Sequence, residues 1–323
     1  MTGQASTLAV EARGLVKIFG DKRAVDEVDL SVPSGHIYAL LGPNGAGKTT
    51  IINMLTTLLK PDGGSAKVFQ HDVLRETQVV RQLISVTGQS AAVDEKLSGR
   101  ENLTVFAMLL GFSRAEANKR ATELLEEFGL ADAANLTLEK YSGGMRRRLD
   151  LASSMIEQAP LIFLDEPTTG LDPRTRLQMW DIIRRLVSTG STIVLTTQYL
   201  DEADQLADRV AVIDRGKVVA EDTPHNLKTA VGKVTLHMQI TNEKDVAQAA
   251  RITEEILGAR ASYPGPKLIT APVTNPEKVT DLLIALRGED IRLSSVSMQE
   301  PTLDEVFLAL TGETKQTEVA ASQ

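Results

Sequence analysis

The order of apolar and polar residues predicts strands and helices in the first part of the chain. The runs 36–41, 161–164 and 191–197 are mostly apolar and of strand length, and residues 50–59 can form a helix until a Lys-Pro pair stops it. The uninterrupted apolar run at 161–164 is typical of a buried parallel strand. We therefore expect an α/β fold with a mixed or parallel sheet.

A helical segment interrupts this part of the chain. Ser113 and Glu116 form a capping box, and apolar residues then recur at helical spacing until Gly129 ends the run. The chain can again form a helix from 144 to 158, before a proline. These patterns predict a helical lobe over about residues 95–160.

The pattern changes after about residue 232, where we place a domain boundary. Strand and helix signals alternate from there, with a Pro-Gly-Pro turn at 264–266. The expected elements are strands at 234–240, 267–273 and 291–298, helices at 244–257 and 276–287, and a last helix that begins at the capping box Thr302 and Glu305. We expect domains at 1–232 and 233–312, the second a small C-terminal α+β accessory domain, and a disordered tail at 313–323.

Composition restricts the class of function. The chain has 323 residues, of which 42% are hydrophobic, but no apolar stretch approaches the length needed to cross a bilayer. It has no cysteine, and its N-terminus lacks the basic and apolar segments of a secretory signal, so we expect a cytoplasmic protein. A formal net charge of −8 argues against a broad nucleic-acid-binding face.

Residues 42–49 fit the phosphate-binding pattern G-x-x-x-x-G-K-[ST] between a predicted strand and a predicted helix. There, glycines let backbone N–H groups close around a polyphosphate, and the helix N-terminus adds partial positive charge. We expect Lys48 to reach the β- and γ-phosphate oxygens and the Thr49 hydroxyl to bind Mg²⁺. The candidate nucleotide-binding residues here are Gly42, Pro43, Asn44, Gly45, Ala46, Gly47, Lys48, Thr49 and Thr50.

Two acidic residues, Asp165 and Glu166, end the predicted strand 161–164. A buried strand of an α/β fold delivers such carboxylates to the carboxyl edge of its sheet. We expect Asp165 to hold the metal, directly or through water, and Glu166 to polarise a water against the γ-phosphate. The alternative is a solvated acidic pair at the start of a loop.

Further segments, within about residues 8–232, resemble the ATP-binding subunits of ABC transporters. The run 141–145, Tyr-Ser-Gly-Gly-Met, is similar to the L-S-G-G-Q signature of that family, with other residues at its first and last positions. Gln89 resembles the Q-loop glutamine, which in the family contacts Mg²⁺ and senses the membrane subunit. Asp172 ends a segment that resembles the D-loop, and Phe19 lies where the family places an aromatic residue that stacks on adenine.

The resemblance implies two partners. Ser142, Gly143 and Gly144 stand at the N-terminus of a predicted helix, a position suited to an anion. In the family, the signature of one subunit closes over the ATP of another, so a second copy in a C2 homodimer is the simplest arrangement. The other implied partner is an integral membrane permease that contacts the helical lobe, which would place the chain on the cytoplasmic face of the cell membrane. Nucleic acid is not expected.

One departure from the family pattern concerns residue 198. The family ordinarily has a switch histidine there, which bridges the γ-phosphate and the catalytic acid, whereas this chain has Gln198. A glutamine amide can donate to a phosphate oxygen, but it cannot carry a proton near neutral pH. We therefore expect a functional but slow ATPase, with Glu166, Lys48 and Gln198 as the candidate catalytic residues. The alternative is that Gln198 only ends a strand.

The segments 196–204 and 301–307 are most similar to the daunorubicin-resistance type of ABC subunit, whose members energise drug or lipid exporters. Two other functions stay open. One is a soluble ABC-type ATPase acting on ribosomes or DNA, which the lack of a coiled-coil or zinc-bearing insertion disfavours. The other is a module that dimerises on ATP with negligible hydrolysis. The accessory domain has one of two kinds of role. It regulates the ATPase, stabilises the dimer or contacts the permease, or it is only a packing appendage.

Two further groups of residues invite other interpretations. Residues 146–148 are three consecutive arginines, and we expect them to form a solvated helix face rather than a nucleic-acid site, because no aromatic residues are interleaved. The histidines lack the spacing of metal ligands, so we expect no metal site beyond nucleotide-bound Mg²⁺. These histidines are His36, His71, His225 and His237.

Overall fold

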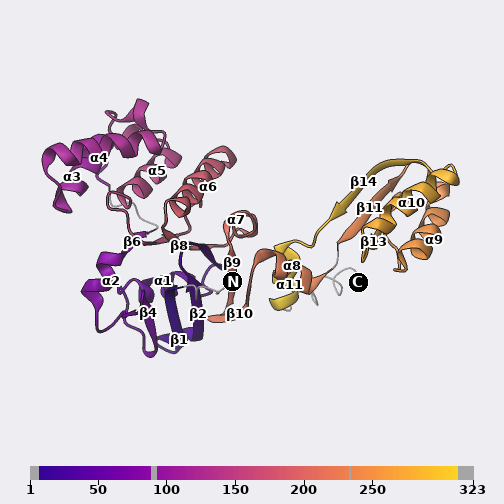
Figure 1. The fold of residues 1–323 in the computed structure, drawn as a ribbon, viewed down its shortest axis with the longest axis horizontal. Coiled ribbons are helices and arrows are strands. Elements are labelled where there is room, and N and C mark those ends of the chain that lie inside the picture. The colour runs from indigo at the N-terminus through magenta and orange to yellow at the C-terminus, as the bar shows by residue number, and fades with distance from the viewer. Residues whose placement is uncertain (1–6, 89–92, 233, 312–323) are drawn as a thin grey trace, which may run out of the picture. The chain divides into compact units, whose positions relative to one another are not determined.

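The structure is a computed structural model that describes residues 7–88, 93–232 and 234–311. The chain divides into two compact units, Met1–Thr223 and Pro224–Gln323 (Figure 1). The domain boundary predicted from the sequence, at about residue 232, lies beyond helix α8 (Pro224–Val231), which the structure groups with the second unit. The expected tail at 313–323 lies outside the described residues.

A six-stranded sheet forms the centre of the first unit, in the order β10-β9-β3-β8-β7-β6. All neighbouring strands in it are parallel except β10 and β9. The strands are β3 (Ile37–Leu41), β6 (Ile84–Thr87), β7 (Leu161–Asp165), β8 (Thr192–Thr197), β9 (Arg209–Asp214) and β10 (Lys217–Asp222). The expected strands at 36–41, 161–164 and 191–197 are therefore confirmed, and the residues of β3, β7 and β8 are all buried.

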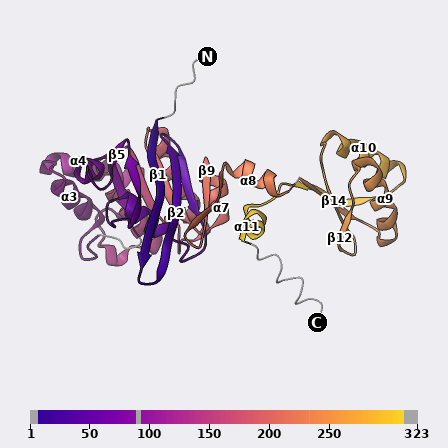
Figure 2. The same cartoon turned by 90° about the horizontal axis from the view of Figure 1, so that it is seen from below.

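A second sheet in this unit is antiparallel, in the order β2-β1-β4-β5, and Figure 2 shows its long strands β1 and β2 side by side. Its strands are β1 (Leu8–Phe19), β2 (Lys22–Pro33), β4 (Gly63–Val68) and β5 (His71–Asp72). Helix α1 (Lys48–Leu55) lies between the two sheets, since Ile51, Ile52 and Leu55 join buried residues of both in one core. The helix was expected at 50–59, but it ends earlier because Thr57 adopts a left-handed φ of 66°.

The helical lobe consists of α3 (Gly99–Leu109), α4 (Arg114–Glu127) and α5 (Gly143–Ser153). The capping box of Ser113 and Glu116 is present at the start of α4. Helix α5 was expected to reach residue 158 but ends at Ser153, where the hydroxyls of Ser153 and Ser154 donate to the carbonyl oxygens of Asp150 and Leu151, both at 2.7 Å. The remaining helices of the unit are α2 (Thr77–Leu83), α6 (Pro173–Ser188) and α7 (Leu200–Leu206).

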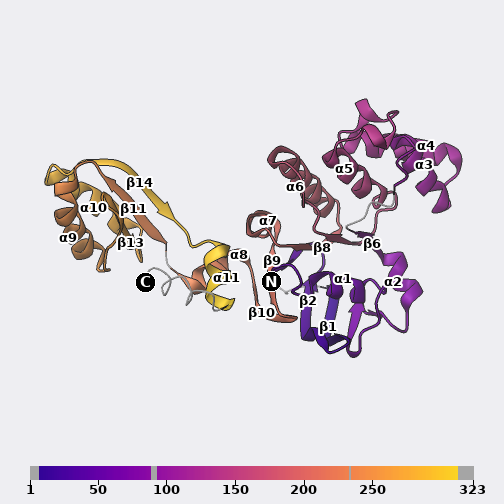
Figure 3. The same ribbon diagram turned by 180° about the vertical axis from the view of Figure 1, so that it is seen from behind.

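The second unit contains a four-stranded sheet in the order β12-β13-β11-β14, with α9 and α10 packed against it (Figure 3). Besides α8 and a short 3-10 helix at Glu243–Asp245, its elements are β11 (Thr235–Ile240), α9 (Val246–Leu257), β12 (Ser262–Gly265), β13 (Leu268–Pro272), α10 (Glu277–Gly288), β14 (Leu293–Gln299) and α11 (Leu303–Thr311). This is a β-α-β-β-α-β arrangement followed by a helix, so the expected α+β class is confirmed.

One strand of the second unit contradicts the sequence analysis, which expected only a turn around Pro264. The structure has strand β12 there, paired with β13 through Ser262 and Thr270. Proline is tolerated at this position because β12 is an edge strand and donates no ladder hydrogen bond from residue 264.

Across the described residues, no helix is long and apolar enough to cross a membrane.

Candidate functional site

The carboxyl ends of four neighbouring strands bring the predicted site residues to one edge of the central sheet. In the order β3, β8, β7 and β6, Leu41 is paired with Thr197, Thr196 with Asp165, and Leu164 with Thr87. The glycine loop, Gln198, the acidic pair and Gly88 follow these strand ends in turn. Ligands of open α/β sheets bind at this edge, outside the carboxyl ends of the strands.

The glycine loop leaves β3 and enters α1 through tight backbone approaches. Gly47 has a φ of 107°, and a Cβ atom there would lie 2.5 Å from the carbonyl oxygen of Ala24. A Cβ on Gly42 would meet the carbonyl oxygen of Ile213. Only glycine fits these two positions without a shift of backbone. Gly47 is also the N-cap of α1 and provides no side-chain cap, which leaves that helix end suited to an anion.

Lys48 is 4% exposed and lies within the loop that it follows. Its ammonium group donates to the carbonyl oxygens of Gly42 at 2.8 Å and Pro43 at 3.0 Å, and its Nζ is 3.7 Å from Oε1 of Glu166. Burial lowers the pKa of Lys48, while the carboxylates of Glu166 and then Asp165 oppose that shift. The buried ammonium therefore stands between the phosphate-binding loop and the acidic strand end.

The acidic pair is anchored by hydroxyl groups from two other elements. Thr49 of α1 donates to Oδ1 of Asp165 at 3.1 Å, and Thr196 of β8 donates to the same oxygen at 2.5 Å. The Thr196 hydroxyl oxygen also accepts from the backbone N–H of Glu166 at 2.9 Å. Asp165 is 5% exposed. Thr196 was not among the predicted site residues, because nothing in an apolar strand distinguishes a threonine that forms hydrogen bonds to the site.

Glu166 has a left-handed backbone with a φ of 48°, and Pro167 follows it. Left-handed residues other than glycine are strained and are often found at functional sites, where the surrounding structure holds them. The Glu166 carboxylate accepts a hydrogen bond from the Thr169 hydroxyl at 3.2 Å in addition to its contact with Lys48. The position of the Glu166 carboxylate is therefore determined by two contacts, one with Thr169 and one with Lys48.

A cavity of about 330 Å³ lies over the glycine loop. Besides the loop and the start of α1, Phe19, Lys22, Ala24 and Glu166 line it. Phe19 is 51% exposed at the end of β1, so part of its ring is accessible to a ligand in the cavity. The structure thus brings Phe19, Asn44, Gly45, Gly47, Lys48, Thr49, Thr50 and Glu166 to one cavity.

Other predicted site residues lie apart from this cavity. Ser142 caps α5 by accepting from the N–H of Met145 at 3.2 Å, and Asp172 caps α6 by accepting from the N–H of Thr175 at 3.0 Å. None of Ser142, Gly143, Gly144 and Asp172 lines the cavity over the glycine loop of its own chain. Gln198 follows β8 and is half-buried, and Gln89 lies outside the described residues.

The arginine triplet contradicts the expectation of a solvated face. Arg146 contacts Glu95 at 2.6 Å and the carbonyl oxygen of Leu138, while Arg148 donates to the carbonyl oxygen of Phe128 at 3.0 Å. The Arg147 side chain is 14% exposed and donates to several backbone carbonyls. The charge of these residues and the lack of interleaved aromatic residues predicted a solvated helix face. In the structure, each guanidinium instead contacts a residue of another segment.

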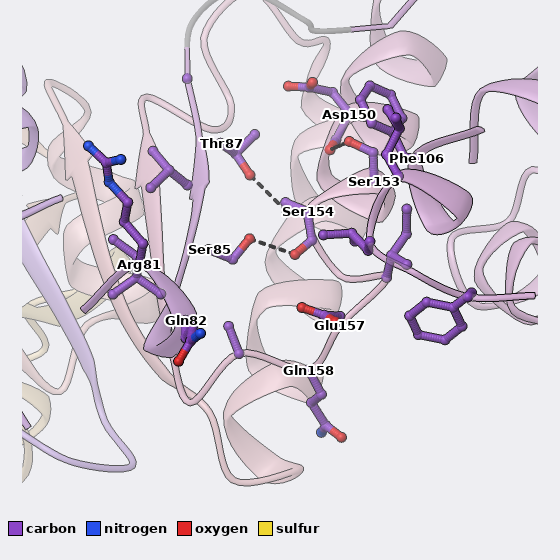
Figure 4. Close-up of a pocket in the computed structure, with 18 residues that line it drawn as sticks. Arg81, Gln82, Ser85, Thr87, Phe106, Asp150, Ser153, Ser154, Glu157 and Gln158 are labelled. Atoms are coloured by element: carbon purple, nitrogen blue, oxygen red, sulfur yellow. Dashed lines mark hydrogen bonds between the residues drawn. The ribbon is translucent and has the colours of Figure 1, made fainter. Parts of the chain in front are cut away.

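A larger groove of about 870 Å³ lies beside β6, between this strand and the helical lobe (Figure 4). The Ser85 hydroxyl donates to the carbonyl oxygen of Ser154 at 2.6 Å, and the Thr87 hydroxyl donates to Ser154 Oγ at 2.9 Å. Apolar side chains of α3 and the residues that follow it rim the groove, and Leu109 is 77% exposed there. The groove includes Gly88, so it begins next to the site edge of the sheet.

The residues present fit a nucleotide with Mg²⁺. The Thr49 hydroxyl and the Asp165 carboxylate, 3.1 Å apart, are the oxygen ligands that Mg²⁺ prefers, and the cavity between Phe19 and Lys48 can hold a base at one end and phosphates at the other. A glycine loop, an uncapped helix N-terminus, a buried lysine and a strand-end acid pair define the class of P-loop ATPases.

The comparisons with known proteins narrow this class. The ABC transporter family profile matches residues 25–169. The chain is 51% identical over 321 residues to the daunorubicin/doxorubicin resistance ATP-binding protein DrrA of Streptomyces peucetius, covering 98% of this chain and 97% of that protein. It is 33% identical over 309 residues to the linearmycin resistance ATP-binding protein LnrL of Bacillus subtilis, covering 94% and 99%.

Solved structures agree with these relatives. A dimeric post-hydrolysis state of an ATP-binding cassette bound to ADP and Pi matches with a TM-score of 0.61 and 25% identity, covering 66% of this chain and 98% of that one. The chain belongs to the ABC transporter family, as an ATP-binding subunit whose ATPase activity is coupled to transport by a separate permease. The family resemblance, the fold class and the ATPase activity expected from the sequence are confirmed.

Glu202 of α7 contacts Thr168, which follows the acidic pair along the chain. It is fully buried, and its Oε1 accepts from the Thr168 hydroxyl at 2.7 Å and from Trp180 Nε1 at 3.2 Å. Burial raises the pKa of Glu202 above its ordinary 4.5. The folded state therefore holds this proton more tightly than the unfolded state, so the contribution of Glu202 to stability falls as the pH rises above about 4.5.

We predict that Glu202→Gln, which does not titrate, gains stability relative to wild type as the pH rises from 5 to 8. For each pH unit between 5 and 8 that lies below the raised pKa of Glu202, the free energy of unfolding of the variant increases relative to wild type by about 1.4 kcal/mol. Urea unfolding followed by the fluorescence of Trp180, the single tryptophan, measures it. Glu126→Gln, at an exposed position of α4, is the control and should show no such trend. An equal difference at both pH values would contradict the prediction.

Proposed function

We propose that this chain uses Mg·ATP to energise the export of a drug, an antibiotic or a lipid-like molecule through a membrane permease. The observation that carries the proposal is the cavity in which Lys48, Thr49 and Glu166 meet. Export is supported by relatives named for daunorubicin/doxorubicin resistance, for linearmycin resistance and for Nod factor export, the last at 36% identity in a Rhizobium species. The chain would then lie on the cytoplasmic face of the cell membrane, held there by the permease.

The roles of the residues follow from their contacts. Thr49 and Asp165 hold Mg²⁺, which neutralises phosphate charge when bound. Lys48 exchanges the carbonyl oxygens of Gly42 and Pro43 for phosphate oxygens, which compensate a buried ammonium better than neutral acceptors do. Phe19 stacks on the base. Glu166 accepts the proton of the attacking water, and its strained backbone fixes the carboxylate for that task.

Two copies complete the nucleotide site. Within one chain, Ser142, Gly143, Gly144 and Asp172 do not line the cavity over the glycine loop, yet α5 presents an N-terminus capped only by Ser142. A second copy, arranged head to tail, brings that helix end to the γ-phosphate side of the nucleotide. The dimeric ADP-bound and Pi-bound relative supports this arrangement.

The groove beside β6 is the proposed contact with the permease. It joins exposed apolar residues of the helical lobe, such as Leu109 and Leu110, to Gly88, the residue before Gln89. A cytoplasmic segment of the permease that packs there would touch both the lobe and the start of the Q-loop. The accessory domain, described at residues 224–232 and 234–311, contributes to regulation, to dimer stability or to contact with the permease.

We predict that Glu166→Gln lowers ATP turnover by about 10²- to 10⁴-fold, because the amide cannot accept a proton from water. The variant should still bind Mg·ATP and accumulate as a dimer, which light scattering after gel filtration detects. Lys48→Ala should lose both ATP retention and turnover. Glu123→Gln, on the surface of α4, is the control and should behave as wild type. Wild-type turnover in Glu166→Gln would exclude the proposed role.

We predict that wild-type turnover shows no titration attributable to position 198, since glutamine does not ionise. Gln198→Ala should turn over ATP more slowly, because the amide no longer positions the water. Gln198→His should be faster and should gain a pH dependence near 6.5, the ordinary pKa of histidine. Turnover of the purified variants measured from pH 5.5 to 8.5 decides between them. Unchanged turnover in the alanine variant would mean that Gln198 only ends its strand.

We predict that Leu109→Glu abolishes association with the permease and leaves the ATPase of the isolated chain unchanged. A charge at this 77% exposed position disrupts apolar packing in the groove without touching the nucleotide cavity. Affinity isolation from membranes, with identification of the co-purifying integral protein, is the measurement. Leu177→Glu, at a 57% exposed position of α6, is the matched control and should retain the partner. Recovery of ribosomes or DNA with wild type would favour the soluble-ATPase alternative.

A further inference from the structure

The arginine triplet at the start of α5 contains one member that reaches the catalytic edge of the sheet. Arg147 Nε donates to the carbonyl oxygen of Pro167 at 3.1 Å, and its Nη2 donates to those of Asp165 at 2.9 Å and Glu166 at 3.2 Å. Its Nη1 donates to the carbonyl oxygen of Gly88 at 2.7 Å. One guanidinium therefore joins the helical lobe to the carboxyl ends of β7 and β6.

Three of these acceptors are the carbonyl oxygens of Glu166 and of the residues on either side of it, where the backbone is strained. Glu166 has a φ of 48°, and the residues that follow and precede it also accept from Arg147. A left-handed, non-glycine residue before a proline is strained and persists only where neighbouring groups hold it. The planar guanidinium of Arg147 donates to three successive carbonyl oxygens and so holds the backbone of Glu166 in this conformation.

The position of Arg147 is itself fixed. The Asp150 carboxylate, one turn further along α5, lies 3.4 Å from its Nη1. Both side chains are largely buried, at 14% and 7% exposure, so the pair is shielded from solvent. Asp150 and Gly88 also line the groove beside β6, so Arg147 contacts two residues of that groove as well as the carbonyl oxygen of Glu166.

We propose that Arg147 is a positioning residue that holds the backbone of Glu166 in its active conformation and links it to the groove beside β6 through the carbonyl oxygen of Gly88. The inference rests on the proposed role of Glu166 in ATP hydrolysis. A movement of the helical lobe or of the residues after β6 is then transmitted to Glu166 by one side chain, without passing through the glycine loop. Arg147 touches neither the P-loop nor the cavity over it.

The kinetic test compares Arg147→Gln with Arg148→Gln in the purified full-length chain. Arg148 is a matched control, since it also donates to backbone carbonyl oxygens, those of Phe128 and Gly129, but within the helical lobe. We expect Arg147→Gln to lower kcat for ATP by about tenfold or more and to leave KM within about twofold, because ATP binding does not involve it. Arg148→Gln should leave kcat within about twofold. A loss confined to KM, an equal loss of kcat in both variants, or no loss would overturn the proposal.

Hydrogen exchange without nucleotide gives a second readout that does not need turnover. In Arg147→Gln, amides in peptides covering residues 84–88 and 165–169 should exchange at least about tenfold faster than in wild type, while Arg148→Gln leaves both peptides unchanged. Unchanged exchange in Arg147→Gln overturns the proposal. A wild-type chain that fails to hydrolyse ATP would instead refute the proposed function, with the exchange result still deciding the role of Arg147. If Arg147→Gln does not fold, Arg147→Lys, which keeps the charge beside Asp150 but offers one nitrogen, replaces it in both measurements.

Discussion

The parallel register of four strands is the constraint on which the site depends. Because β3, β8, β7 and β6 pair side by side in the same direction, the loops that leave them start from one edge of the sheet. Sequence positions as distant as 42, 88, 166 and 198 are thereby adjacent in space. A slip of any of these strands by one residue would also turn its buried side chains to the other face, so the apolar cores on both faces hold the register.

The parts of the site that could be predicted from the sequence are those that a short segment determines by itself. The glycine loop needs its glycines because backbone approaches closely at Gly47, and the acidic pair follows directly from an apolar strand. Thr196 and Arg147 could not be predicted, since their bonds reach segments far away in the chain and their own neighbours give no sign of it. Strand β12 was missed for a related reason, because a proline on an edge strand looks like a turn when its partner strand is unknown.

Buried charges of both signs are concentrated around the same edge. Lys48 of α1 contacts the Glu166 carboxylate, Arg147 of α5 contacts the backbone carbonyl oxygens of the acidic pair, and each cation is largely removed from solvent. Burial lowers the pKa of both cations, and neighbouring carboxylates oppose the shift in each case. A nucleotide enters a site whose charges already compensate one another, so binding requires exchange of partners rather than creation of new charged groups.

Among the described residues that line it, the cavity over the glycine loop offers one carboxylate, that of Glu166, to the proposed proton transfer. Among the described residues that line it, the ionisable side chains are Lys22, Lys48 and Glu166, and none is a histidine. A lysine ammonium has three donors and no acceptor, so neither Lys48 nor Lys22 takes a proton from water. Gln198 cannot replace the missing imidazole as a proton carrier. In the proposed mechanism Glu166 is the acceptor among these residues, so the position of its backbone, which Thr196 and Arg147 contact, matters more here than in a site that shares the proton with a histidine.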